Sequence, residues 1–267
     1  MTKTPPITLT IAGSDSGGGA GIQADLKTFH QFGVFGTSVI TAITAQNTVE
    51  VRAVAPVERS MVRAQLDAVA NDLPPAAFKT GMLATAEIAT EVADAITTHR
   101  WRRYVLDPVM VSTSGHRLLD AGGEVVLRER LLPLATLVTP NLDEAELLAG
   151  ITVRDPAAMD EAGRRLLARG AGAALIKGGH LAGKELVDVL VTKAGIKRIR
   201  HPRIPTTSTH GTGCTLSAAI TAGLALGWEL DVAVATGLDF VARAIAAAPG
   251  LGSGQGPVSH FVEVKGE

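Results

Sequence analysis

Cys214 is the residue whose surroundings point first to chemistry. It is the single cysteine of the chain and lies in the segment His210-Gly211-Thr212-Gly213-Cys214-Thr215, where a glycine-rich turn opens into an uncharged stretch typical of a helix. The first N–H groups of a helix lack intrahelical partners and carry the positive end of its dipole, so they bind anions such as phosphate. The same field lowers a thiol pKa, and we expect Cys214 to ionise easily and to take the proton of a substrate hydroxyl. Position alone leaves open the alternative of a small buried apolar residue.

Charged and polar residues follow apolar runs at three further places. Lys177 comes directly after the run 173–176 and suits a phosphate clamp, and Asp107 ends the run 104–106. Phosphoryl transfer depends mostly on positioning and charge neutralisation, which such groups supply. Each also has an ordinary interpretation, as a lysine reaching along its stem to solvent or an aspartate in a turn before proline. The spacing of Asn141 and Glu144 is likewise typical of a helix cap with an acidic first turn.

The glycine-rich segment 13–21 is typical, taken by itself, of a phosphate or dinucleotide loop between a strand and a helix. Two absences argue against that function. The segment lacks the Gly-Lys-Ser/Thr ending of a Walker loop, and no acidic residue occurs between Asp25 and Glu50, where a dinucleotide-binding unit places its ribose ligand. A dinucleotide oxidoreductase is therefore disfavoured, and a generic turn remains open.

Gln46 follows an apolar strand in Ala45-Gln46-Asn47. Its amide places a carbonyl acceptor beside an NH2 donor, which fits the edge of an aminopyrimidine, where an exocyclic amine lies next to a ring nitrogen acceptor. An isolated glutamine at this place is also compatible with a solvated strand end.

Apolar runs of strand length alternate with amphipathic runs of helix length, which predicts an α/β protein with a mostly parallel sheet covered by helices on both faces. We predict strands at 7–12, 39–45, 77–79, 104–106, 137–139 and 173–177, and a hairpin of 186–192 with 197–201. Helices are predicted at 58–73, 86–98, 122–132, 143–148, 157–169 and 231–248. No repeat and no long linker divides the chain, so we expect one domain over residues 1–267. Ligands of such sheets collect at the carboxyl ends of the strands.

Composition limits the classes of partner. The 25 basic and 26 acidic residues nearly cancel, and no basic run with interleaved aromatics predicts a nucleic-acid surface. One cysteine cannot form an internal disulfide, and the first residues lack a signal pattern, so we expect a cytoplasmic protein. The uncharged stretch 211–228 is as long as the shortest membrane spans, but its many small residues favour a buried helix.

Several segments, in one order, resemble the hydroxymethylpyrimidine/phosphomethylpyrimidine kinases, a family of ribokinase-like small-molecule kinases. They are the segments 12–27, 41–48, Lys79-Thr80-Gly81-Met82-Leu83, Asp107-Pro108-Val109-Met110, Thr139-Pro140-Asn141, Ile176-Lys177-Gly178-Gly179-His180, 209–215 and Gly256-Pro257-Val258. The resemblance runs from about Ile7 to Phe261. It implies a three-layer ribokinase-like sandwich, a homodimer, and the use of ATP and Mg2+.

The resemblance also implies roles for individual residues. On the acceptor side, Gln46 reads the pyrimidine, Asp25 faces the substrate, and Gly13, Met82 and Val109 line the same pocket. On the nucleotide side the implied set is Lys177, Asn141 and Thr212, with Asp107 and Glu144 around Mg2+, usually through water.

Around the transferring phosphate, Gly211, Thr212 and Gly213 form the anion pocket. Cys214 replaces the aspartate that serves as base in most ribokinase-like sugar kinases. His210 is expected to shape the loop rather than to move a proton.

The implied activity is phosphorylation of 4-amino-5-hydroxymethyl-2-methylpyrimidine to its monophosphate and then to its diphosphate, in thiamine biosynthesis. A pyridoxal or pyridoxine kinase of the same superfamily is the nearest alternative, and Gln46 discriminates between the two. A non-catalytic pyrimidine-binding sensor is a further alternative, although a sensor should have lost Cys214, Lys177 or the Asn141/Glu144 pair, all of which are present.

Overall fold

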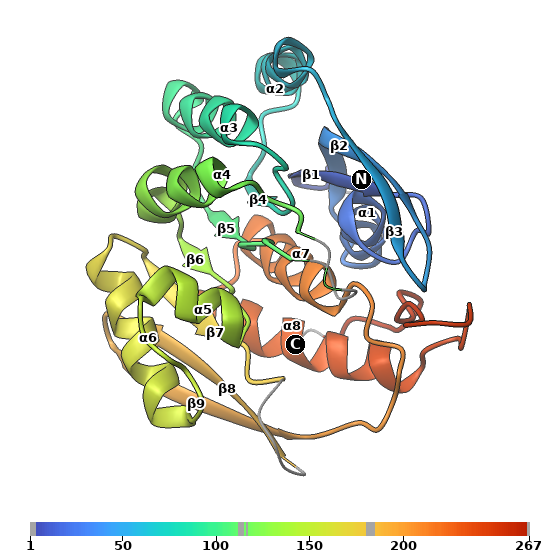
Figure 1. The fold of residues 1–267 in the computed structure, drawn as a ribbon, viewed down its shortest axis with the longest axis vertical. Helices are drawn as coiled ribbons and strands as arrows, with labels where there is room; N and C mark the ends of the chain where they lie inside the picture. The colour runs from blue at the N-terminus through green and yellow to red at the C-terminus, as the bar shows by residue number, and fades with distance from the viewer. Residues whose placement is uncertain (1–3, 112–114, 116, 180–184, 266–267) are drawn as a thin grey trace.

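A computed structural model describes residues 4–111, 115, 117–179 and 185–265. His180, the last residue of one family segment, lies outside this part of the chain. The strands form one sheet in the order β3-β2-β1-β4-β5-β6-β7-β8-β9 (Figure 1). Their bounds are β1 Ile7–Asp15, β2 Phe35–Gln46, β3 Val51–Pro56, β4 Ala77–Thr80, β5 Tyr104–Leu106, β6 Leu137–Val138, β7 Ala173–Ile176, β8 Glu185–Thr192 and β9 Gly195–Pro202. Strands β2, β1, β4, β5, β6 and β7 are parallel, and β3, β8 and β9 pair antiparallel at the two edges.

Helices cover both faces of the sheet, as the three-layer expectation requires. They are α1 Gly21–Gln31, α2 Arg59–Asp72, α3 Ala86–His99, α4 Ala121–Val126, α5 Leu142–Ala149, α6 Pro156–Ala168, α7 Thr212–Ala225 and α8 Leu230–Ala246. One buried apolar cluster joins a face of the sheet to α2, α3, α5 and α6, and the second joins the other face to α1, α7 and α8. Figure 1 shows α7 and α8 beside each other, on the side of the central strands opposite α3, α4 and α5.

Local sequence signals determine where several helices begin. Asp155 caps α6 by accepting a hydrogen bond from the Ala158 N–H, with Pro156 at the first helical position, as predicted. The predicted helix 122–132 is shorter than expected: α4 ends at Val126 and continues as a π turn Leu127–Leu131 and a 3₁₀ turn Leu132–Leu134. Pro133 explains the change, because it has no N–H to continue an α-helical ladder.

The principal difference from prediction lies at the sheet edge next to Gln46. Strand β3 was not predicted, because only Val51 and Val54 are partly buried there and the alternation is weak. It pairs antiparallel with the end of β2 and so holds Gln46 opposite Val51. The uncharged stretch 211–228 is the buried helix α7 and the turn after it. In the part of the chain that the structure describes, no helix is long and apolar enough to cross a membrane.

Candidate active site

Strand alternation brings three charged residues to the face of the sheet that α7 covers. Ala77, Val105 and Leu175 belong to the apolar cluster shared with α1, α7 and α8. Side chains two positions apart on a strand point to the same face. Lys79, Asp107 and Lys177, each two residues further along, therefore emerge on that face at the carboxyl ends of β4, β5 and β7.

Asp107 and Lys177 lie next to the first turn of α7. The Lys177 ammonium is 3.3 Å from Asp107 Oδ1, and the Ser217 hydroxyl donates to Asp107 Oδ2 at 3.0 Å. A Cβ at Gly213 would lie 3.2 Å from Lys177 Nζ, so a side chain there would crowd the ammonium. Burial raises the pKa of Asp107, but Lys177 and the other cations and donors outweigh it, so its pKa lies below the ordinary value. The pair is a charged cluster beside a helix start.

The N-terminus of α7 suits an anion. Gly211 caps the helix with φ of 80°, which favours glycine, and no side chain caps the first turn or adds an acidic group there. A Cβ on Gly211 would also collide with the carbonyl oxygen of Gly19, so the turn packs directly on the first glycine loop. The N–H groups of Gly213 and Cys214 belong to the first turn and have no acceptor within the helix. Together with Lys177 they form a cationic recess.

The structure corrects the expectation that Cys214 ionises easily. Burial raises the pKa of the Cys214 thiol to about 12, although Lys79 and the Gly21 N–H act in the opposite direction. Desolvation of the thiolate thus outweighs the field of the helix terminus. The sulfur is nevertheless close enough to Lys79, Asp25 and Asp107 for their charges to influence it.

The expectation that Asp25 faces the substrate is also corrected. Its carboxylate is fully buried, accepts from the Thr10 hydroxyl at 2.6 Å, and binds the Lys79 ammonium at 2.8 Å. Burial lowers the pKa of Lys79, but Asp25, Cys214 and Asp107 raise it on balance, which keeps the lysine charged. Asp25 therefore holds Lys79 in place beneath Cys214 and contacts no open cavity.

Asn141 and Glu144 adopt the helix-cap arrangement that their spacing predicts. They form a capping box at the start of α5: Asn141 Oδ1 accepts from the Glu144 N–H at 2.9 Å, and Glu144 Oε2 accepts from the Asn141 N–H at 2.8 Å. A backbone bridge places Asn141 beside Lys177. Burial raises the pKa of Glu144 to about 7, against the lowering effect of Lys177. The helix cap thus places a buried carboxyl near the Asp107–Lys177 pair.

Metal binding by protein groups alone is not indicated. Among the described residues, no group of three or more His, Cys, Asp or Glu side chains is arranged to hold a metal ion. Asp107 and Glu144 nevertheless influence each other's charge, and both are buried. Two carboxylates near a phosphate recess fit Mg2+, which keeps several waters and takes its other ligands from phosphate oxygens.

The acceptor side of the site has apolar walls. A Cβ at Gly13 would lie 3.0 Å from Met82 Sδ, so Gly13 and Met82 are in contact. Met82 belongs to a small apolar cluster with Ala42, and Val109 packs against it. The structure thus brings together the three predicted wall residues at the ends of β1, β4 and β5.

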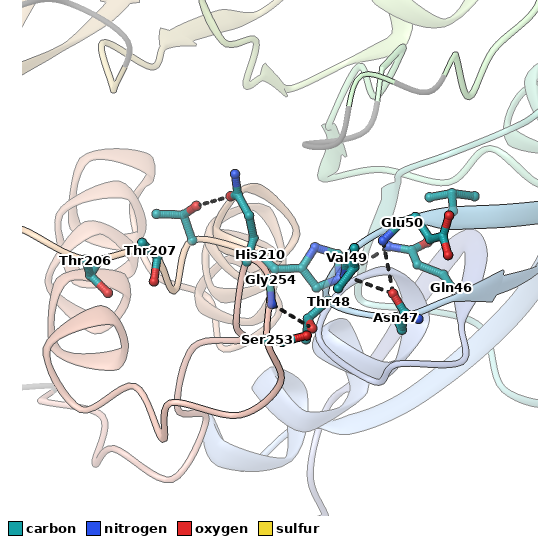
Figure 2. Close-up of a pocket in the computed structure, with 13 residues that line it drawn as sticks. Gln46, Asn47, Thr48, Val49, Glu50, Thr206, Thr207, His210, Ser253 and Gly254 are labelled. Atoms are coloured by element: carbon teal, nitrogen blue, oxygen red, sulfur yellow. Dashed lines mark hydrogen bonds between the residues drawn. The ribbon is translucent and has the colours of Figure 1, made fainter.

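Gln46 lies at the edge of a cavity of about 560 Å³ between the β2–β3 turn and two C-terminal loops (Figure 2). The loops contribute Thr206, Thr207, Thr209, His210 and residues 253–255. The Gln46 amide lies 3.3 Å from His210 Nε2 and 3.3 Å from Thr44 Oγ1. Thr44 in turn donates to the carbonyl of Ser14, next to Gly13. Gln46 is therefore adjacent to the apolar walls and accessible from the cavity.

A family model described as phosphomethylpyrimidine kinase matches residues 15–259. The chain belongs to this kinase family. The hydroxymethylpyrimidine/phosphomethylpyrimidine kinase of Rhizobium meliloti is 51% identical over 258 residues, which cover 96% of this chain and 97% of that protein. The enzyme of the same name from Bacillus subtilis is 46% identical over 95% of this chain and 94% of its own length. The thiamine biosynthesis bifunctional protein ThiED of Geobacter sulfurreducens is 50% identical, and this chain spans about half (52%) of its length.

Solved structures support the kinase fold. The phosphomethylpyrimidine kinase of Clostridium difficile has a TM-score of 0.81 at 44% identity, covering 90% of this chain and 99% of its own. A Bacillus subtilis pyridoxal kinase in an ADP complex has a TM-score of 0.90 at 39% identity, covering 96% and 97% of the two chains. The ribokinase-like fold predicted from the resemblance is thereby confirmed.

Three residues of this kinase's site were not predicted. Lys79 had a detectable signal, because a lysine at the end of a short, otherwise apolar strand needs a buried carboxylate partner. Asp15 is the last residue of β1, and after Ser16 come three glycines, a position at which a carboxylate organises backbone N–H groups. Ser217 had no signal, since only the packing of α7 against β5 brings it to Asp107.

Proposed function

We propose that this kinase phosphorylates 4-amino-5-hydroxymethyl-2-methylpyrimidine with ATP, and then phosphorylates the monophosphate to the diphosphate, in thiamine biosynthesis. The observation that carries the proposal is the position of Cys214. Its sulfur interacts electrostatically with Lys79 and Asp25 of one ion pair and with Asp107 of the other, and Lys177 in turn is influenced by Cys214. A hydroxymethyl group on a ring held by Met82 and Val109 would be close to both the thiol and the anion recess.

The phosphoryl group is stabilised by fixed positive groups. The Gly213 and Cys214 N–H groups in the first turn of α7 and the Lys177 ammonium neutralise charge that spreads over the phosphoryl oxygens during transfer. Asn141 and Thr212 contact the nucleotide phosphates. When bound, Mg2+ supplies further neutralisation of the phosphates, and Asp107 and Glu144 would hold it, mainly through water.

Cys214 acts in the first step only. As a thiolate it accepts the proton of the substrate hydroxyl while the new P–O bond forms, and Lys79 beneath it stabilises that negative charge. In the second step the acceptor is a phosphate that is already ionised, so a base contributes little and the recess dominates.

The surroundings of the enzyme follow from the same proposal. The kinase acts on small molecules in the cytoplasm as a homodimer, without nucleic-acid or membrane partners. Support for small-molecule substrates comes from the family match and from a cavity of about 560 Å³ beside Gln46. Gel filtration with light scattering tests the dimer.

The second candidate is a pyridoxal kinase, because structures of pyridoxal kinases from Bacillus subtilis and Staphylococcus aureus share this fold with TM-scores of 0.90. An ADP-release assay with hydroxymethylpyrimidine, its monophosphate and pyridoxal side by side decides between the two. We expect turnover with both pyrimidines at a kcat/KM well above that for pyridoxal. A preference for pyridoxal would overturn the assignment of a pyrimidine substrate, while the assignment as a kinase would stand.

A further inference from the structure

Asp15 lies at the centre of a set of hydrogen-bond donors behind Gln46. Its Oδ1 accepts from the Gly17 N–H at 2.8 Å, and its Oδ2 accepts from the Gly19 and Ala20 N–H groups at 3.0 and 2.8 Å. The same Oδ2 lies 2.9 Å from His210 Nε2. Burial raises the pKa of Asp15, but the hydrogen bonds and the charge of His210 outweigh it, so its pKa lies below the ordinary value. The group is an ionised carboxylate that can only accept hydrogen bonds.

This carboxylate determines where His210 carries a proton. A nitrogen 2.9 Å from an ionised carboxylate oxygen must donate, so Nε2 of His210 bears hydrogen. The same Nε2 lies 3.3 Å from one end of the Gln46 amide. Because its one proton points to Asp15, this nitrogen has no lone pair to accept from an amide NH2, and an amide nitrogen there would place two donors face to face. An amide oxygen at that distance can share the proton. The oxygen of Gln46 therefore belongs on the His210 side.

Thr44 imposes the same orientation from the other end of the amide. Its hydroxyl has one proton, and the carbonyl oxygen of Ser14, 2.9 Å away, can only accept it. Thr44 Oγ1 can then only accept a hydrogen bond from the Gln46 amide, 3.3 Å away, so the NH2 group of the amide must face it. The structure places Nε2 of Gln46 toward His210 and Oε1 toward Thr44. In that orientation Thr44 must share its one proton between Oε1 and the Ser14 carbonyl, and two N–H groups face each other at His210. A half turn of the amide, which exchanges its oxygen and nitrogen, removes both conflicts.

We propose that Asp15, acting through His210 and together with Thr44, fixes the Gln46 amide in one orientation and thereby makes the kinase selective for 4-amino over 4-oxo pyrimidines. This rests on the proposed function, in which Gln46 reads the pyrimidine edge. A 4-aminopyrimidine presents a donor amine beside an acceptor ring nitrogen, and a 4-oxopyrimidine presents an acceptor oxygen beside a donor N–H. An amide in one fixed orientation matches only one of these donor–acceptor orders, while an amide that is free to turn would match both. Asp15 and His210 are positioning residues in this scheme.

The test compares kcat/KM, by ADP release, for hydroxymethylpyrimidine and for its 4-oxo analogue. His210→Phe removes the N–H and keeps a ring, and Thr44→Val removes the lone pair at constant size. Both leave the backbone contacts of Asp15 intact. Thr97→Val, which removes a hydroxyl that donates to the Ala93 carbonyl within α3 and does not line the cavity, is the matched control.

We expect both variants to lower the amino-to-oxo preference about tenfold or more, mainly through a lower KM for the oxo analogue, with the control unchanged. Suppose that Gln46→Leu impairs pyrimidine use but that His210→Phe and Thr44→Val both keep the wild-type preference for the amino over the oxo substrate. This result would overturn the orienting role and leave the function of Gln46 in place. Unchanged pyrimidine KM in Gln46→Leu would instead overturn the proposed function of Gln46, and the orienting role with it.

Discussion

The raised pKa of Cys214 makes the base mechanism testable by pH. Burial holds the thiol pKa at about 12, so the thiolate is a minor species near neutral pH, about 10⁻⁴ of the enzyme at pH 8. Below its pKa, the fraction of thiolate increases about tenfold per pH unit. If the thiolate takes the hydroxyl proton, kcat for hydroxymethylpyrimidine must rise with pH along that slope, because a base acts only when deprotonated.

The assay is ADP release from about pH 7 to 9, with the free alcohol and the monophosphate as separate acceptors and ATP saturating. We expect a steep rise for the alcohol and a nearly flat profile for the monophosphate. Cys214→Ala should lower the alcohol reaction by about 10²- to 10⁴-fold and abolish its pH slope, while the monophosphate reaction loses less. A flat alcohol profile in the wild type, or equal losses for both acceptors in Cys214→Ala, would refute proton transfer to Cys214 and leave it a structural role at the start of α7.

The other predictions concern the two halves of the site and the ion pair beneath them. Gln46→Leu should raise the pyrimidine KM by an amount corresponding to about 1–3 kcal/mol per unpaired hydrogen-bonding group, without raising the ATP KM; the opposite pattern in steady-state kinetics would place Gln46 on the nucleotide side. Lys177→Ala should lower turnover of both steps by similar factors with pyrimidine binding unchanged in calorimetry, and normal turnover in either step would remove Lys177 from the site. Lys79→Met should destabilise the protein by about 3–5 kcal/mol in urea unfolding, because it leaves Asp25 buried without a countercharge, and Lys79→Met combined with Asp25→Leu should recover most of that loss. A single variant as stable as the wild type would show that the pair is not needed for folding.

Most helices, strands and strand ends were predictable from the sequence because buried residues recur with a regular period along a strand or a helix. The alternation that puts Val105 and Leu175 in the core also places Asp107 and Lys177 on the α7 face, and both were recognised from sequence. Strand β3 was missed because an edge strand with exposed side chains lacks that period. The predictions that Cys214 ionises easily and that Asp25 faces the substrate were wrong for one reason. The sequence shows a helix start and a carboxylate, but the extent to which each group is desolvated depends on packing among α1, β4 and α7.

The two halves of the site are positioned by different parts of the fold. This difference explains how one fold can serve two kinds of vitamin kinase. The phosphate half consists of residues at the ends of central strands and the start of a buried helix, so a change there would disturb the core. The acceptor half depends on Gln46 at the edge of the sheet and on loop contacts through Thr44, His210 and Asp15. We therefore expect substitutions at that rim to change which ring is bound without changing the phosphoryl transfer. A pyridoxal kinase with a TM-score of 0.90 to this chain is therefore compatible with a pyrimidine kinase here, because backbone similarity does not report the hydrogen-bond order at Gln46, which we propose determines the acceptor.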